Sequence, residues 1–111
     1  QLTDRIADLI KSGGEWIASQ ELENCLMGHA AVREAAVIGV AHPKWGERPL
    51  AAVVLKQGQT CTAEELRAVL AARFPKFWLP DAFVFVDTIP RTSAGKFKKS
   101  ELRETFRDYR W

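Results

Sequence analysis

The stretch "VREAAVIGVA", residues 32–41, predicts a strand at the centre of the fold. After a charged start it is almost continuously apolar and rich in strand-forming residues, which is typical of a strand covered on both faces. A second apolar stretch, "LAAVVLK" at 50–56, predicts another buried strand. The segment between them, "HPKWGERP" at 42–49, contains two prolines and a glycine and is predicted to be a loop.

Capping and spacing signals predict two helices outside these strands. Apolar residues at helical spacing follow Ser19, an expected N-cap, and Gly28 is expected to end that helix. Thr62 and Glu65 have the spacing of a capping box and begin a second amphipathic helix. Pro75 is expected to stop it.

The remaining segments complete the fold. A hairpin is predicted at 8–18 around a Gly-Gly turn, a third strand at about 82–87, and a final amphipathic helix at 98–109. The order of elements predicts an α+β fold, an α/β sandwich. In it, an N-terminal β-hairpin and a three-stranded sheet pack against about three helices.

Length and composition narrow the class of protein. The chain has 111 residues, 47% hydrophobic and 27% charged, as expected for one globular domain. No apolar run approaches the ~20 residues of a membrane helix, and no stretch resembles a signal peptide. The chain begins in mid-pattern, which suggests a piece of something longer. Cys25 and Cys61 are expected to be free, which favours a cytoplasmic protein, and no Cys/His spacing predicts a zinc site.

Positive charge is concentrated at the C-terminal end. Residues 91–111 carry seven Lys/Arg and three Asp/Glu, whereas residues 1–90 carry nine and eleven. An anionic partner and a solvated basic helix face both fit this pattern. A small nucleic-acid-binding module is disfavoured, because Phe97 and Phe106 fall at apolar-face spacing instead of being interleaved with basic residues.

The stretch "PRTSAGKFKKSELR", residues 90–103, places Lys96 after four small residues. Such a segment can approach another surface closely, and its lysine is a point charge suited to a phosphate or carboxylate. A P-loop is excluded because Pro90 replaces the first glycine and Phe97 follows the lysine. On this evidence alone, an ordinary exposed loop lysine remains open.

The predicted hairpin, "LIKSGGEWI" at 9–17, is a second candidate site. Glycines at its turn permit positive φ and close approach of a ligand. Lys11 and Trp16 could flank an anionic, planar group by charge and stacking. The alternative is a hairpin with Trp16 in the core. Trp45 and Trp78 are expected to be packing anchors.

Both stretches together resemble one family. "DRIADLIKSGGEWI" at 4–17, "ENCLMGHAAVREAAVIGVAHPKWGERPLAAVVL" at 23–55 and "IPRTSAGKFKKSELRE" at 89–104 are similar to the C-terminal domain of adenylate-forming acyl-CoA synthetases. The forms "IKSGGEWI" and "PRTSAGKF" are closest to fatty acyl-CoA ligases. The resemblance covers essentially the whole chain.

The resemblance implies a two-step ligase reaction. The parent enzyme would activate a fatty acid with ATP and Mg²⁺ to an acyl adenylate, which CoA then converts to acyl-CoA. A large N-terminal domain, outside this chain, would hold the acid, the Mg²⁺ and most of the nucleotide site. Residues 1–8 would be the remnant of the hinge and 9–111 the mobile C-terminal domain, inactive alone. The parent would be cytoplasmic, or associated with a membrane through its other parts.

The resemblance also assigns residues. Lys96 matches the lysine that reaches the active site during adenylation, and Arg5 an arginine near the ribose. The hairpin would contact adenylate and line the pantetheine channel, through Lys11, Gly13, Gly14, Glu15 and Trp16. The hinge would lie at Ala7 and Asp8. The family usually has Lys or Asp where Ala7 stands, so this departure leaves hinge motion to the backbone.

Two further implications concern partners. "PRTSAGK" fits a pattern that lysine acetyltransferases recognise on this family, so an acetyltransferase and deacetylase acting on Lys96 are expected partners. The alternatives are an adenylation enzyme that uses another acid or a carrier protein and, more distantly, the nucleic-acid-binding module.

Overall fold

A computed structural model describes residues 9–90, 99–107 and 109 of the chain. The predicted order of elements is confirmed. The elements are β1 (Leu9–Ser12), β2 (Glu15–Ala18), α2 (Ser19–Met27), β3 (Val32–His42), β4 (Gly46–Leu55), α3 (Ala63–Ala71), the 3₁₀ helix η1 (Lys76–Trp78), β5 (Ala82–Phe85) and α4 (Lys99–Thr105).

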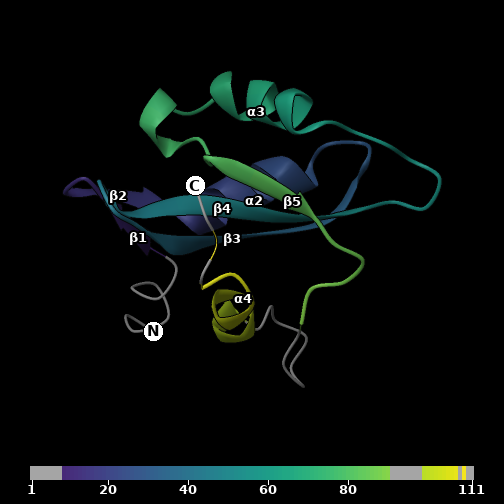
Figure 1. The fold of residues 1–111 in the computed structure, drawn as a ribbon. Helices are drawn as coiled ribbons and strands as arrows, with labels where there is room; N and C mark the ends of the chain where they lie inside the picture. The colour runs from purple at the N-terminus through teal and green to yellow at the C-terminus, as the bar shows by residue number, and fades with distance from the viewer. Residues whose placement is uncertain (1–8, 91–98, 108, 110–111) are drawn as a thin grey trace.

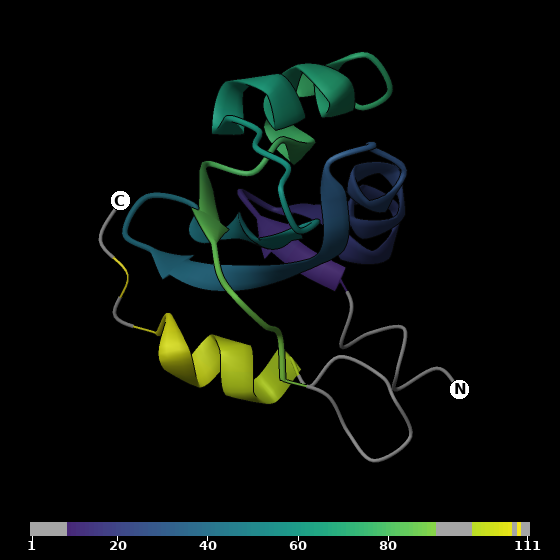
Figure 2. The same cartoon turned by 90° about the vertical axis from the view of Figure 1, so that its right-hand side faces the viewer.

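The strands form two sheets. β1 and β2 make an antiparallel hairpin, and the second sheet has the order β3-β4-β5, with β3–β4 antiparallel and β4–β5 parallel. Helices α2 and α3 lie on one side of the larger sheet and α4 on the other (Figures 1 and 2). The α+β fold predicted from the sequence is therefore confirmed.

Alternation along the central strands explains why they are apolar throughout. Side chains on one face of β3 and β4, such as Val37 and Val53, join the core under α2, α3 and the hairpin. Side chains on the opposite face, such as Ile38 and Ala52, join a second apolar cluster with Leu102 of α4. Since both faces are buried, neither strand needs polar residues in its middle.

The loop predicted at 42–49 is shorter than expected, because β4 already begins at Gly46. Pro49 lies inside this strand, opposite Gly39. The Pro49 carbonyl accepts the Asp81 N–H at 3.1 Å, so the position that lacks an N–H faces β5. Because N–H and C=O of one strand residue point the same way, Pro49 removes no hydrogen bond between β3 and β4.

Local signals at the helices agree with the structure, with two corrections. The helix α3 ends at Ala71, four residues before Pro75, so the proline is not what stops it. The capping box of Thr62 and Glu65 is present at the start of α3. Gly28 ends α2, but the N-cap is Ala18, which makes no side-chain capping bond, and Ser19 is the first helical residue. Both cysteines are free, as predicted. Among the described helices, each is too short or too polar to cross a bilayer.

Candidate functional site

The hairpin turn has the geometry that its glycines predict. Lys11 pairs with Trp16 and Ser12 with Glu15, which leaves Gly13 and Gly14 as the two turn residues. Their φ angles are +57° and +87°. Positive φ at both central positions is what a tight type I′ turn requires, and glycine adopts it without steric cost.

The two glycines have different surroundings. The Gly13 N–H donates to the Trp45 carbonyl at 2.9 Å. A Cβ at Gly13 would lie 2.9 Å from Cε3 of the Trp45 indole, whereas a Cβ at Gly14 would meet nothing within 4 Å. Gly13 therefore joins the hairpin to the β3–β4 turn, and Gly14 leaves open space at the tip.

Two lysine–tryptophan pairs flank this tip. Lys11 Nζ lies 5.5 Å from the ring centroid of Trp16, and Lys44 Nζ lies 5.0 Å from that of Trp45. The tryptophans are 52% and 44% exposed. The alternative with Trp16 in the core is thus excluded. The indole of Trp45 packs on Gly13, as expected of a packing residue, but it is 44% exposed and does not belong to the core. Trp78 is half-buried against the core and stacks on Phe74, as predicted.

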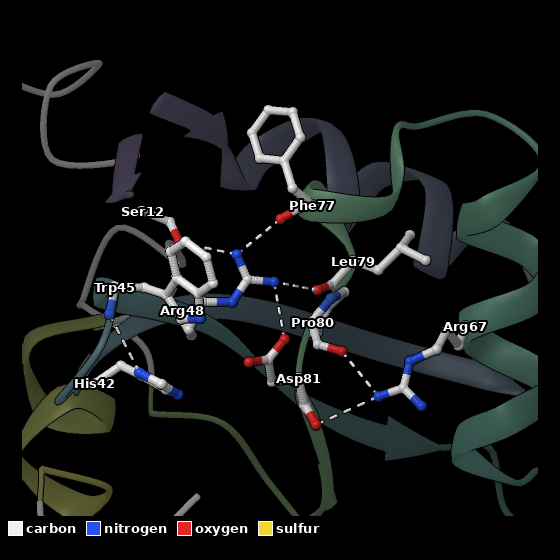
Figure 3. A network of polar contacts seen from close by, with 9 residues as sticks. All are labelled: Ser12, His42, Trp45, Arg48, Arg67, Phe77, Leu79, Pro80 and Asp81. Carbon is white, nitrogen blue, oxygen red and sulfur yellow. Dashed lines mark hydrogen bonds and ion pairs between the residues drawn. The ribbon is translucent and has the colours of Figure 1, made fainter. Parts of the chain in front are cut away.

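The β3–β4 turn is ordered by a histidine. Nδ1 of His42 accepts the backbone N–H of Lys44 at 3.0 Å. It also accepts the backbone N–H of Trp45 at 3.3 Å (Figure 3). These hydrogen bonds hold Lys44 and Trp45 beside the hairpin, although neither residue lies in a helix or a strand. In the structure His42 therefore acts as a turn-forming acceptor.

Arg48 anchors the hairpin from below (Figure 3). Its buried guanidinium donates to Ser12 Oγ of β1 at 2.9 Å and to Asp81 Oδ1 at 2.8 Å. It also donates to the carbonyls of Phe77 and Leu79, at 2.8 and 3.0 Å. One side chain of β4 thus holds the hairpin, η1 and the start of β5 in fixed relation.

The structure brings together part of the predicted site. Lys11, Gly13, Gly14, Glu15 and Trp16 lie at one exposed tip. Arg5, Ala7, Asp8 and Lys96 lie outside the described residues. Sequence reasoning missed the contributions of Trp45 and Arg48, because both lie in the segment predicted as a loop.

The fold and this tip define a class of domain: a small mixed sheet with helices on both faces and a glycine-tipped hairpin carrying exposed cationic and aromatic side chains. Residues 21–96 match the AMP-binding enzyme C-terminal domain. The chain belongs to that family.

Similar proteins agree with this assignment. The chain is 59% identical over 110 residues to a long-chain-fatty-acid–CoA ligase of Thermus thermophilus, covering 98% of this chain and 20% of that protein. A fatty acyl CoA synthetase of Mycobacterium tuberculosis superposes with a TM-score of 0.84 at 36% identity, over 91% of this chain and 20% of that one. ATP-bound MatB of Rhodopseudomonas palustris gives 0.87 at 36% identity, over 92% and 20%. The chain spans about a fifth of the length of these relatives.

Proposed function

We propose that this chain is the mobile C-terminal domain, residues 9–111, of an AMP-forming fatty-acid–CoA ligase. The parent would use ATP to convert a fatty acid to acyl-AMP and then transfer the acyl group to CoA. The observation that carries the proposal is the 59% identity to a long-chain-fatty-acid–CoA ligase along 98% of this chain. A cytoplasmic location agrees with the two free thiols.

The open hairpin tip supports a site that a second surface completes. Trp16 and Trp45, the two tryptophans at this tip, are 52% and 44% exposed, and tryptophan is enriched at binding interfaces. In our proposal the large N-terminal domain of the same enzyme covers this tip. In this arrangement Arg5 would lie near the ribose of the bound nucleotide. The backbone around Ala7 and Asp8 would serve as the hinge between the two domains.

Lys11 and Trp16 are suited to a nucleotide by their chemistry. An indole face can stack on a purine, and an adjacent ammonium can offset phosphate charge. Gly14 leaves room at the turn, so the pantetheine arm of CoA could pass close to the backbone beside Gly13 and Glu15. These groups would bind and orient the substrates, and they carry out no bond-making step.

Lys96 is the proposed catalytic residue. Its ammonium would bridge the substrate carboxylate and the α-phosphate of ATP and offset the negative charge that develops as the oxygen attacks phosphorus. The four small residues before it would allow this lysine to enter the site of the other domain. When the domain rotates for thioester formation, Lys96 would leave and the hairpin tip would take its place.

Mg²⁺ is assigned to the large domain. Over the described part of the chain, the group of donor atoms that could hold an ion includes a thiol and an imidazole, and Mg²⁺ prefers hard oxygen ligands. These residues do not fit magnesium, and we derive no step from this chain through the ion.

The acid and the thiol acceptor are open at the level of this domain. A ligase that uses another acid, or a carrier protein in place of CoA, would share this domain, because the acyl pocket lies outside it.

We also propose regulation by acetylation. Acetylation of Lys96 by a lysine acetyltransferase, reversed by a deacetylase, would remove the charge that adenylation needs. Peptide mapping after treatment with a lysine acetyltransferase tests this regulation. The proposal fails if Lys96 stays unmodified while other lysines react.

The function is tested with the intact protein in wild-type and Lys96→Ala forms, with the two half-reactions measured separately. Pyrophosphate release from fatty acid and ATP is expected to fall by ~10²-fold or more, the scale for a positioned electrostatic group. Formation of acyl-CoA from supplied acyl adenylate and CoA should persist. Lys98→Ala, which removes the same charge two residues away, is the matched control. If Lys96→Ala and Lys98→Ala behave alike, the proposed role is wrong.

A further inference from the structure

Three metal-ligating side chains meet where α2 ends and α3 begins, in a part of the domain that the proposed function does not use. His29 follows α2, and Cys61 and Glu65 lie 32 and 36 positions further along the chain. One ligand atom from each lies within 4.8 Å of the other two. His29 and Cys61 are half-buried, and Glu65 is exposed.

The separations are close to those of a tetrahedral zinc site. Sγ of Cys61 lies 3.9 Å from Nε2 of His29 and 3.9 Å from Oε2 of Glu65. Zinc bonds of ~2.3 Å to sulfur and ~2.0–2.1 Å to nitrogen or oxygen would put tetrahedral donor atoms roughly 3.5 Å apart. A shift of a few tenths of an ångström at the sulfur contacts, with adjustment of the exposed Glu65 side chain, reaches that geometry.

The two oxygens of Glu65 are already divided between two tasks. Oε1 accepts from Thr62 N at 3.4 Å and from Thr62 Oγ1 at 3.3 Å, within the capping box of α3. Oε2 faces Cys61. A ligating carboxylate held by hydrogen bonds through its other oxygen is a usual feature of metal sites. Oε2 can therefore bind a metal while the cap of α3 stays intact.

We propose that His29 Nε2, Cys61 Sγ and Glu65 Oε2 bind one Zn²⁺, with water as the fourth ligand. Thiolate, imidazole and carboxylate together suit zinc, whereas harder cations prefer oxygen alone. The ion would join the turn after α2 to the first turn of α3.

Hydrogen bonds in the structure show which protons zinc would displace. The Ala31 N–H donates to His29 Nδ1 at 3.0 Å, so the neutral ring carries its proton on Nε2, facing the sulfur. Zinc at Nε2 shifts that proton to Nδ1 and breaks the Ala31 bond, and zinc at Sγ releases the thiol proton to solvent. Binding is therefore accompanied by release of one proton and by adjustment of residues 28–31.

The test uses metal-free intact protein and two probes, Zn²⁺ alone and Co²⁺ alone. Zn²⁺ affinity is measured by competition with a chromogenic chelator, and Co²⁺ reports sulfur ligation through its thiolate charge-transfer band. Wild-type protein is expected to take up one zinc at this site and to show the band. Cys61→Ser should lose the band and weaken zinc binding by tenfold or more, while Cys25→Ser, the matched control, should retain both.

Two further variants separate ligation from folding. His29→Asn keeps an acceptor for the Ala31 N–H but removes Nε2, and Glu65→Gln keeps the capping acceptor but removes the carboxylate. Each should retain the wild-type circular dichroism and bind zinc more weakly. The proposal is overturned if wild-type protein shows no thiolate band, or if Cys61→Ser, His29→Asn and Glu65→Gln all bind zinc as the wild type does.

Discussion

Arg48 of β4 and Asp81 at the entry to β5 form an ion pair of 2.8 Å in which the arginine is buried and the carboxylate is partly exposed. The other donors of the same guanidinium satisfy Ser12 and two carbonyls of the η1 segment. The pair is thus part of a junction between strands, 3₁₀ helix and hairpin.

Arg48→Met is expected to lower the free energy of unfolding by about 3 kcal/mol, because it removes one partner of a buried, hydrogen-bonded network. Asp81→Asn should cost less, about 1 kcal/mol, since the amide oxygen can still accept. Urea unfolding of the chain measures both. Equal effects of the two substitutions would show that the guanidinium contributes only through Asp81.

Gly13 and Gly14 offer a matched pair of substitutions. Both have positive φ, so an alanine at either site should cost about 1 kcal/mol in backbone strain. Gly13→Ala should cost more, because its Cβ would lie 2.9 Å from the Trp45 ring. Thermal unfolding compares the two variants.

A double variant isolates the contact between a Cβ at position 13 and the Trp45 indole. Combined with Trp45→Ala, Gly13→Ala should lose its excess cost over Gly14→Ala, since the indole is gone. An excess that persists without the indole would mean that strain alone distinguishes the two glycines.

Trp16→Ala separates binding from stability. Because the side chain is 52% exposed, the free energy of unfolding should change by no more than about 0.5 kcal/mol. Loss of a stacked ring in the proposed ligase should reduce acyl-CoA formation by intact protein roughly tenfold. Phe85→Ala, on β5 and 44% exposed, is the control and should leave the rate unchanged. A normal rate for Trp16→Ala would remove the indole from the proposed site.

The thiol of Cys61 should ionise at a higher pH than an ordinary cysteine thiol. Partial burial, followed by the nearby Glu65 carboxylate and its hydrogen bond, raises the pKa of Cys61, although hydrogen bonding with the Thr62 backbone opposes the shift. In metal-free protein carrying Cys25→Ser, the rate of alkylation should therefore rise at higher pH than in the unfolded chain. Because the unfolded thiol ionises first, this group disfavours the folded state as pH rises past the unfolded pKa.

Glu65→Gln should move the alkylation profile of Cys61 to lower pH, since it removes the negative charge and keeps the residue's size. Rates measured with an alkylating reagent across a pH series give the midpoint. A profile unchanged by this substitution would leave burial as the sole cause of the raised pKa.

Much of the fold could be predicted because its signals are local. The alternation of two buried faces in 32–41 and 50–56, the Gly-Gly turn and the capping box at Thr62 each act within a few residues. The sequence reading failed at 46–49, where Pro49 is tolerated only because its missing N–H faces β5. That depends on which strand lies beside β4, which no local pattern encodes.

The site could be predicted in part for the same reason. Lys11 and Trp16 are neighbours across a tight turn, so their proximity follows from the hairpin register. The contact of Trp45 with Gly13, and that of His29 with Cys61, join residues 32 positions apart in each case. Such contacts depend on the packing of whole elements, and residue types alone give no signal for them.

Ile89 and Leu102 are buried in the same apolar cluster, on the face of the sheet that α4 covers. The chain that leaves this cluster after Ile89 has to return to it by Leu102, and Lys96 lies between these two anchors. Loop closure costs only about 0.6 kcal/mol for each doubling of length. The fold therefore fixes both anchors, and an insertion or deletion between them should change the free energy of unfolding little. In the proposed ligase, such a change would affect catalysis through Lys96 more than it affects folding.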